Sequence, residues 1–132
     1  MADITGAHHA AFTVTDVERS RVWYEDLLGM TTVMQVDDDE VSVRVLAHPA
    51  SGLVIGLRQY HSHDDGAFSE FRTGLDHLAL GVPTRADLEA WQAELEKRSV
   101  DFSPITETPI GTVIVFRDPD NIQLEFWLPM GS

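Results

Sequence analysis

The chain has 132 residues and a mass of 14.7 kDa, and its hydrophobic fraction of 43% is enough to bury the core of one domain. It contains no cysteine, which excludes disulfide frameworks, thiolate zinc sites, iron–sulfur clusters and cysteine nucleophiles. Nine Lys and Arg against 22 Asp and Glu give a formal net charge of −13, which repels phosphate backbones and anionic lipid, so we expect no nucleic acid and no membrane partner.

Two segments of similar pattern give the chain an internal repeat. His9 opens HAAFTVTDVERSRVW and His77 opens HLALGVPTRADLEAW, and a tryptophan, Trp23 or Trp91, ends each segment at the same spacing. Each histidine begins a short apolar run of strand character, and each run leads into a helix. The chain therefore reads as two copies of one module.

Local signals mark where both helices begin and where the first one ends. Thr15 with Glu18 has the spacing of a capping box, and Thr84 with Asp87 is an acidic counterpart. Gly29 is suited to end the first helix in the left-handed conformation. The apolar stripes predicted to face the core are Val17, Tyr24, Leu27 and Leu28 in the first helix, and Leu88, Trp91, Leu95 and Val100 in the second.

Three strands are predicted after each helix. They span Thr31–Val36, Glu40–Leu46 and Leu53–Gln59 in the first half, and a weak strand near Asp101–Ser103, Thr112–Arg117 and Ile122–Leu128 in the second. The polar connector 61–73 is too short to separate two independent domains. We predict one α+β domain over residues 1–132, in which module 1 (about 6–60) and module 2 (about 74–130) are tandem βαβββ units.

The alternation of side chains along the strands points to a candidate site. The bulky residues of the first and fifth strands must pack on the helices, which leaves His9 and His77 on the opposite face among small residues. In the last strand, Leu124, Phe126 and Leu128 share one face, and Gln123, Glu125 and Trp127 share the other. Glu125 is a carboxylate within an apolar strand, which is costly to bury unless it is paired or binds a cation.

Two imidazoles and one carboxylate in repeat-related places favour a metal site. Such a set binds one face of an octahedral ion and leaves neighbouring positions open for substrate, water or oxygen. The alternative is that His9 and His77 are satisfied core histidines and that Glu125 reaches an arginine.

Further residues are candidates for substrate contacts. Arg58 follows Gly56 by two positions and can hold a carboxylate through two hydrogen bonds, or it can form an ion pair at the strand end. Gln123 and Trp127 flank Glu125 on the cleft face. The connector contains His61 and His63 followed by Asp64 and Asp65, which is either a solvated loop or a lid that supplies a base.

The chain resembles the vicinal oxygen chelate superfamily. The segments HHAAFTVTDVERSRVWYEDLLGM, GLDHLALGV and FRDPDNIQLEFW carry the resemblance, which covers essentially the whole chain. This superfamily groups glyoxalase I, extradiol dioxygenases, fosfomycin-resistance transferases, methylmalonyl-CoA epimerases and bleomycin-resistance proteins. The resemblance implies paired βαβββ modules that form a cupped mixed sheet around a central metal cleft. It also implies one divalent ion (Fe, Mn, Zn, Ni or Co) on His9, His77 and Glu125, and a homodimer.

The chain departs from each named member of the superfamily. Glyoxalase I and the epimerases have a fourth ligand, Glu or Gln, on the fourth strand, where this chain has Gly56. The dioxygenases have a tyrosine ten residues before the terminal glutamate, where this chain has Val115, and they are commonly longer. The transferases bind a phosphonate through a segment that reads TETPIGTVIVF here and contains no Lys or Arg.

These observations lead to one principal hypothesis and two alternatives. The principal one is a glyoxalase-like metalloenzyme that chelates a small oxygenated substrate for lyase or isomerase chemistry, with Glu125 or a histidine of the connector moving the proton. The alternatives are an Fe(II) extradiol-type dioxygenase and a non-catalytic drug-binding protein like those of bleomycin resistance. The segment MADITGAHH lacks the features of a secretory signal, so we expect a cytoplasmic location.

Overall fold

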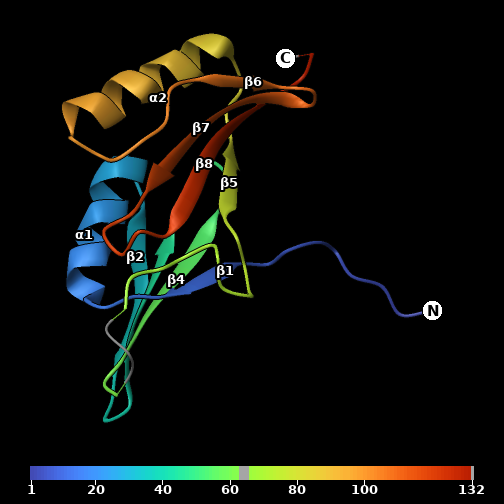
Figure 1. Cartoon of the computed structure of the whole chain (residues 1–132). Coiled ribbons are helices and arrows are strands. Elements are labelled where there is room, and N and C mark those ends of the chain that lie inside the picture. Colours follow the sequence, from blue (N-terminus) through green and yellow to red (C-terminus); the bar gives the residue numbers. More distant parts are fainter. Residues whose placement is uncertain (63–65, 132) are drawn as a thin grey trace. The chain divides into compact units, whose positions relative to one another are not determined.

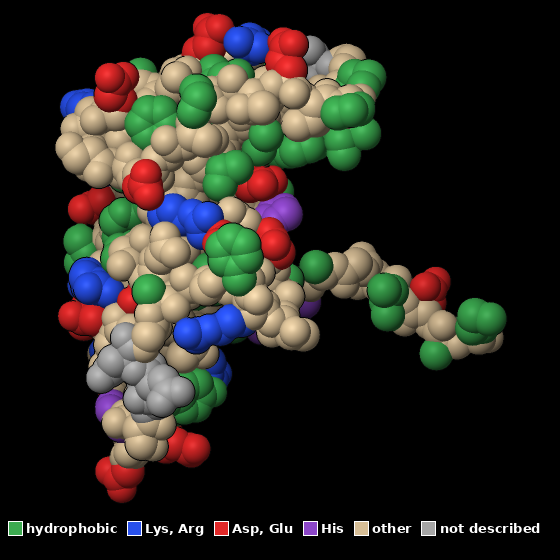
Figure 2. All heavy atoms as spheres, viewed as in Figure 1, with side chains coloured by type: hydrophobic (Ala, Val, Ile, Leu, Met, Phe, Trp, Pro, Cys, Tyr) green, Lys and Arg blue, Asp and Glu red, His purple; other side chains and the backbone are tan. Residues whose placement is uncertain are grey.

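The computed structural model describes residues 1–62 and 66–131, and the chain divides into two compact units (Figure 1). Unit 1 is Met1–Gly66 and unit 2 is Ala67–Ser132. The boundary between them falls inside the predicted connector. Acidic side chains are spread over the visible face of the molecule, as the net charge of −13 requires (Figure 2).

Unit 1 is a four-stranded mixed sheet with one helix. Its elements are β1 (Ala10–Thr13), α1 (Val17–Leu28), β2 (Thr31–Asp37), β3 (Val41–Ala47) and β4 (Val54–Tyr60). The strand order is β1-β4-β3-β2, with β1 parallel to β4 and the other pairs antiparallel. The edge strand β2 contains a bulge between Thr32 and Met34.

Unit 2 repeats the same topology. Its elements are β5 (Leu78–Gly81), α2 (Arg85–Lys97), β6 (Thr106–Thr108), β7 (Gly111–Arg117) and β8 (Gln123–Pro129), in the order β5-β8-β7-β6. The predicted fold class, α+β with tandem βαβββ modules, is confirmed, with the strands forming one four-stranded sheet in each unit. No described helix is long and apolar enough to cross a membrane.

In each unit the helix packs on the bulky face of its own sheet. Helix α1 buries the predicted stripe together with Ser20, and Phe12 and Val14 of the first strand segment are buried on the same side. In unit 2, Leu88 and Leu95 are fully buried, and the Trp91 ring stacks on Phe126 with the ring centroids 4.3 Å apart. Burial of these faces fixes the register of each strand, because a slip of one residue would expose its apolar side.

The helix ends agree with the predictions except at the start of α1 and at the end of α2, which stops at Lys97, before the predicted stripe residue Val100. The Thr84 hydroxyl accepts a hydrogen bond from the Asp87 N–H, and Gly29 ends α1 at φ 67°. The prediction that Thr15 caps α1 is wrong: Asp16 is the cap, and its carboxylate accepts from the Arg19 N–H at 3.1 Å. Thr15 and Asp16 are both good caps, and the chain enters the helix one residue later than the capping-box spacing indicated.

The weak strand predicted near Asp101–Ser103 is also displaced. Phe102 forms only an isolated bridge with Phe116, and the strand β6 begins at Thr106. Pro104 has no N–H to donate, so a regular ladder cannot continue through this position.

Candidate functional site

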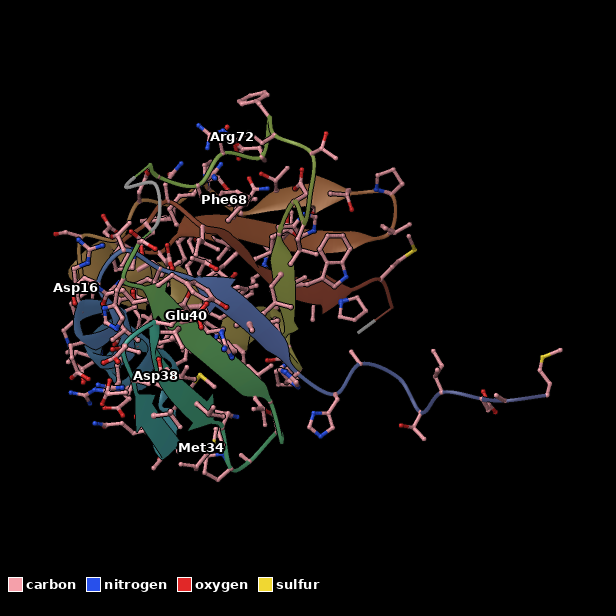
Figure 3. The ribbon with its side chains drawn as sticks, turned by 90° about the horizontal axis from the view of Figure 1, so that it is seen from below. Asp16, Met34, Asp38, Glu40, Phe68 and Arg72 are labelled. Atoms are coloured by element: carbon pink, nitrogen blue, oxygen red, sulfur yellow. The ribbon has the colours of Figure 1, made fainter. Side chains whose placement is uncertain are left out.

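The face of the unit 1 sheet opposite α1, called the open face because the helix of this unit does not cover it, carries a glycine and valines together with an arginine and a tyrosine. Strand alternation places Gly56, Arg58 and Tyr60 of β4 on this open face, because Ile55 and Leu57, on either side of Gly56, are fully buried on the helix side. The cross-strand partners on β3 are Val45, Val43 and Val41, and Met34 on the edge strand β2 pairs with Val45 (Figure 3).

The corresponding face of unit 2 has a different chemistry. Gln123, Glu125 and Trp127 lie on the open face of β8, whereas Leu124, Phe126 and Leu128 are buried against α2. Ala79 and Gly81 of β5 leave space beside them, as the sequence predicted.

The strand register identifies which residues of the two units occupy equivalent places. Gly56 pairs in parallel with Ala11, two residues after His9, and Glu125 pairs in parallel with Ala79, two residues after His77. Gly56 is therefore the structural counterpart of Glu125. By the same ladders, Arg58 is the counterpart of Trp127.

The structure brings two of the three predicted ligands together within unit 2. The Nε2 atom of His77 lies 3.3 Å from Oε1 of Glu125. The Glu125 side chain is 13% exposed, whereas the His77 side chain is 39% exposed. A half-exposed imidazole beside a mostly buried carboxylate is accessible to a ligand from the open face of the sheet.

A continuous series of hydrogen bonds leads to the Nδ1 atom of His77. The Nδ1 atom of His77 is 2.7 Å from Oδ1 of Asp76, and the same carboxylate oxygen accepts from Nε2 of Gln123 at 2.7 Å. The Gln123 Oε1 atom accepts in turn from Arg117 Nη2 at 2.9 Å. Arg117 is held by the Glu70 carboxylate at 2.5 Å, so the series begins in the segment before β5 and ends at the imidazole.

These contacts fit either a proton or a divalent ion between Nε2 of His77 and Oε1 of Glu125. With Nδ1–H donated to Asp76, the lone pair of Nε2 faces a carboxylate oxygen, and a proton or a cation between these two electron-pair donors would stabilise the contact. Cis ligands at metal bonds of 2.0–2.1 Å are about 3 Å apart, which is close to the observed spacing. The arrangement is the carboxylate–histidine pattern typical of metal-binding imidazoles.

The third predicted ligand, His9, lies in unit 1 immediately before β1. Its Nδ1 atom is 2.9 Å from Nδ1 of His8, and both side chains are exposed, which removes the core-histidine interpretation for His9. No three or more His, Cys, Asp or Glu side chains in the described part of the chain are grouped as a metal centre.

Arg58 and Trp127 each lie close to a neighbouring residue within their own unit. The Arg58 Nε–H donates to the Tyr60 hydroxyl at 3.1 Å, and its Cζ lies 5.7 Å from the centroid of the same ring. Within the described residues, Arg58 forms no ion pair with a carboxylate. The Trp127 indole lies so close to Gly111 that a Cβ there would be 3.1 Å from two of its ring atoms.

The structure describes only part of the connector predicted to form a loop or a lid. His61 is exposed and its backbone N–H donates to the Glu40 carbonyl at 2.9 Å. The predictions for His63, Asp64 and Asp65 lie outside the described residues. Phe68 and Arg72 flank a turn in the segment before β5, where the Arg72 N–H donates to the Ser69 carbonyl (Figure 3).

Sequence reasoning did not single out Asp76, Tyr60 or Gly111. The neighbouring pair Asp76-His77 was a detectable signal, because a carboxylate next to a histidine can orient its ring. The i, i+2 spacing of Arg58 and Tyr60 was another, since it places both on one strand face. The contact between Asp76 and Gln123 spans 47 positions and depends on the sheet register.

Comparisons with known proteins agree with the paired βαβββ architecture. The curated relative YwkD of Bacillus subtilis (strain 168), an uncharacterized protein, is 27% identical over 123 residues, which is 91% of this chain and 94% of that protein. A glyoxylase/bleomycin resistance protein/dioxygenase domain from Frankia sp. EAN1pec superposes with a TM-score of 0.89 at 35% identity, covering 96% of this chain and 99% of that one.

A more distant solved structure shares the fold. FosX, the fosfomycin resistance protein of Listeria monocytogenes, complexed with Mn(II) and sulfate, has a TM-score of 0.72 at 15% identity and covers 98% of this chain and 94% of that one. The family model named Glyoxalase/Bleomycin resistance protein/Dioxygenase superfamily matches residues 6–126. Because that match spans both βαβββ units, the chain belongs to this superfamily, which the sequence motifs had indicated.

Proposed function

We propose that the protein is a glyoxalase-like metalloenzyme in which His9, His77 and Glu125 hold one divalent ion. The observation that carries the proposal is the geometry of His77, whose Nε2 faces Glu125 Oε1 at 3.3 Å while Nδ1 is engaged by Asp76. His9 completes the set because it occupies in unit 1 the place that His77 occupies in unit 2. FosX, a relative by fold, binds Mn(II), which supports a divalent ion in this architecture.

Each protein group has a defined part in this proposal. A bound divalent ion supplies Lewis acidity toward two adjacent oxygens of a small substrate. Glu125 is the candidate group for moving a proton, because its mostly buried carboxylate lies on the open face where the substrate would sit. The reaction class is lyase or isomerase chemistry on an oxygenated small molecule.

The open faces also suggest how the substrate is held. Arg58, which donates to the Tyr60 hydroxyl, is the candidate for binding a substrate carboxylate through its guanidinium group. Trp127 offers an apolar wall on the other unit's open face. Gln123 remains a weaker substrate contact in this proposal, because both ends of its amide bind protein groups.

The second candidate is an Fe(II) extradiol-type dioxygenase. It is favoured by Gly56, which leaves a three-ligand set of the kind that non-haem iron oxygenases use. It is disfavoured by Val115, which pairs with Glu125 across β7 and β8 and has no side-chain proton to transfer.

A homodimer and a cytoplasmic location complete the proposal. Sedimentation of the purified protein tests whether it is a dimer.

The deciding experiment is elemental analysis of untagged protein, purified without chelator or added metal. We expect about one atom of manganese, nickel, zinc or cobalt per chain, and about one atom of iron would move the assignment to the dioxygenase. The variants His9→Ala and His77→Ala should each lose the metal and keep the wild-type circular dichroism spectrum.

The matched control is His48→Ala, which removes a histidine from the turn between β3 and β4, where its ring contacts Ser51. That variant should retain the metal. A wild-type protein that takes up none of these ions, even after soaking with each, would overturn the enzyme assignment and favour a drug-binding protein.

A further inference from the structure

The imidazole of His77 lies between two carboxylates that have different surroundings. On one side Glu125 Oε1 is 3.3 Å from Nε2, and on the other Asp76 Oδ1 is 2.7 Å from Nδ1. The shorter contact is the stronger hydrogen bond and decides which nitrogen carries the proton when the ring is neutral. By this criterion a neutral ring would carry its hydrogen on Nδ1 and present the lone pair of Nε2 toward Glu125.

Asp76 is itself held in place, which is unusual for a side chain that is 58% exposed. Its Oδ1 accepts from Gln123 Nε2 at 2.7 Å, and its backbone carbonyl accepts from the same nitrogen at 3.4 Å. Gln123 is fixed at its other end by Arg117, which Glu70 holds. A mobile carboxylate would orient the ring weakly, whereas one held by a series of three side chains sets both tautomer and ring angle.

We infer that Asp76 is the positioning residue that keeps Nε2 of His77 unprotonated and directed at the open face, and that Gln123 acts through Asp76. The role in metal binding rests on the proposed function, but the tautomer does not depend on it. Asp76 acts on the imidazole only, so its removal should weaken metal binding without removing any ligand.

The tautomer is the first readout, measured by nitrogen-15 NMR of the histidine rings in metal-free protein at pH 9. The His77 signals are assigned by their loss in His77→Gln. In the wild type we expect the hydrogen on Nδ1. In Asp76→Ala we expect it to move to Nε2, which can then donate to Glu125, whereas Asp76→Asn, whose amide oxygen still accepts, should retain the wild-type tautomer.

Metal affinity is the second readout, measured by calorimetric titration of metal-free protein with Mn²⁺. We expect the dissociation constant to rise about 10- to 100-fold in Asp76→Ala, the range typical of lost outer-shell partners, and less in Gln123→Ala. The matched control Asp101→Ala removes an exposed aspartate of the same unit and should leave both readouts unchanged.

The two readouts separate failure of this inference from failure of the proposed function. An Asp76→Ala variant with the wild-type tautomer overturns the inference. So does one with wild-type Mn²⁺ affinity while His77→Ala has none. If wild-type protein binds neither Mn²⁺ nor any other ion tested, the proposed function fails, and the tautomer alone decides the role of Asp76.

Discussion

The two units share a backbone plan and differ in what they place at equivalent positions. On the open faces, unit 1 has Gly56 and Arg58 where unit 2 has Glu125 and Trp127. The difference extends to the helix side, where Arg44 of β3 pairs with Leu57 and its counterpart Ile114 of β7 pairs with Phe126.

This difference shows that the repeat sets geometry and that individual side chains set chemistry. The same ladder holds a carboxylate in one unit and an empty place in the other, with an arginine two residues farther along the strand in the unit that lacks the carboxylate. In the proposed function, the carboxylate of unit 2 is a metal ligand, and the arginine of unit 1 is a substrate contact. Substitutions that make one unit resemble the other test this division.

The largest effect is expected when unit 2 is given the residue of unit 1. Glu125→Gly removes one of three proposed ligands, and a ligand in a tight site contributes about 3 kcal/mol, or 100- to 1,000-fold in affinity. Calorimetric titration with Mn²⁺ measures this loss. Glu89→Gly would be a poor comparison because it lies inside α2, so the matched control is Glu107→Gly on the edge strand β6. Equal losses in both variants would count against Glu125 as a ligand.

The next largest effect concerns Trp127 and the glycine against which it packs. In Gly111→Ala, the new Cβ would lie 2.5 Å from the Leu128 carbonyl oxygen and 3.1 Å from the indole, so backbone and ring must both shift. We expect the free energy of unfolding to fall by about 2.5 kcal/mol, as measured by urea denaturation. Gly81→Ala is the control, because its Cβ would meet no heavy atom within 4 Å. Similar stabilities for the two variants would contradict the close packing.

The sequence predicted most of the fold because its signals were local. The helix stripes, the Gly29 stop and the small-residue face of each histidine strand follow from periodicity within single segments. Thr15 was chosen over Asp16 because two capping residues are adjacent, and β6 was displaced because Pro104 interrupts the ladder.

The candidate site was predictable as a set of residue types and less so as a set of contacts. The alternation of side chains along each strand places Glu125 and His77 on the open face, and the structure brings the two side chains together. The role of Gln123 could not be anticipated, since its contact with Asp76 joins β8 to the segment before β5. Such contacts depend on register, which one strand's sequence does not specify.

A smaller effect is expected when unit 1 is given the carboxylate of unit 2. In Gly56→Glu the Cβ would be 3.4 Å from the Ala11 Cβ, which is an ordinary contact, so the sheet should tolerate the added Cβ. The new carboxylate at position 56 would be a fourth ligand and should raise Mn²⁺ affinity about tenfold, or 1.4 kcal/mol. Gly56→Ala adds the same Cβ without a ligand and should leave the affinity unchanged. If Gly56→Glu binds no better than Gly56→Ala, then Gly56 does not lie beside the ion.

The smallest effect concerns the helix side, where Arg44→Ile copies unit 2. Arg44 is buried and donates to Glu18 at 2.8 Å and to Asp37 at 2.9 Å. Both carboxylates are about half exposed and can be solvated when the arginine is removed, and an isoleucine fills part of the space. The stability at pH 7 should therefore fall by only about 1 kcal/mol.

The pH dependence distinguishes this ion pair from simple packing. The hydrogen bond from Arg44 is the main cause of the lowered pKa of Glu18, with Arg21 next, and of the lowered pKa of Asp37, with Ser42 next. A carboxyl whose pKa is lower in the folded state stabilises the fold above its unfolded pKa, and this contribution is lost as the pH falls through the folded pKa. Wild-type stability should thus fall below about pH 4, and Arg44→Ile should fall less steeply. Arg72→Ile, which removes an exposed arginine, should keep the wild-type slope, and equal slopes in all three proteins would show that Arg44 contributes packing alone.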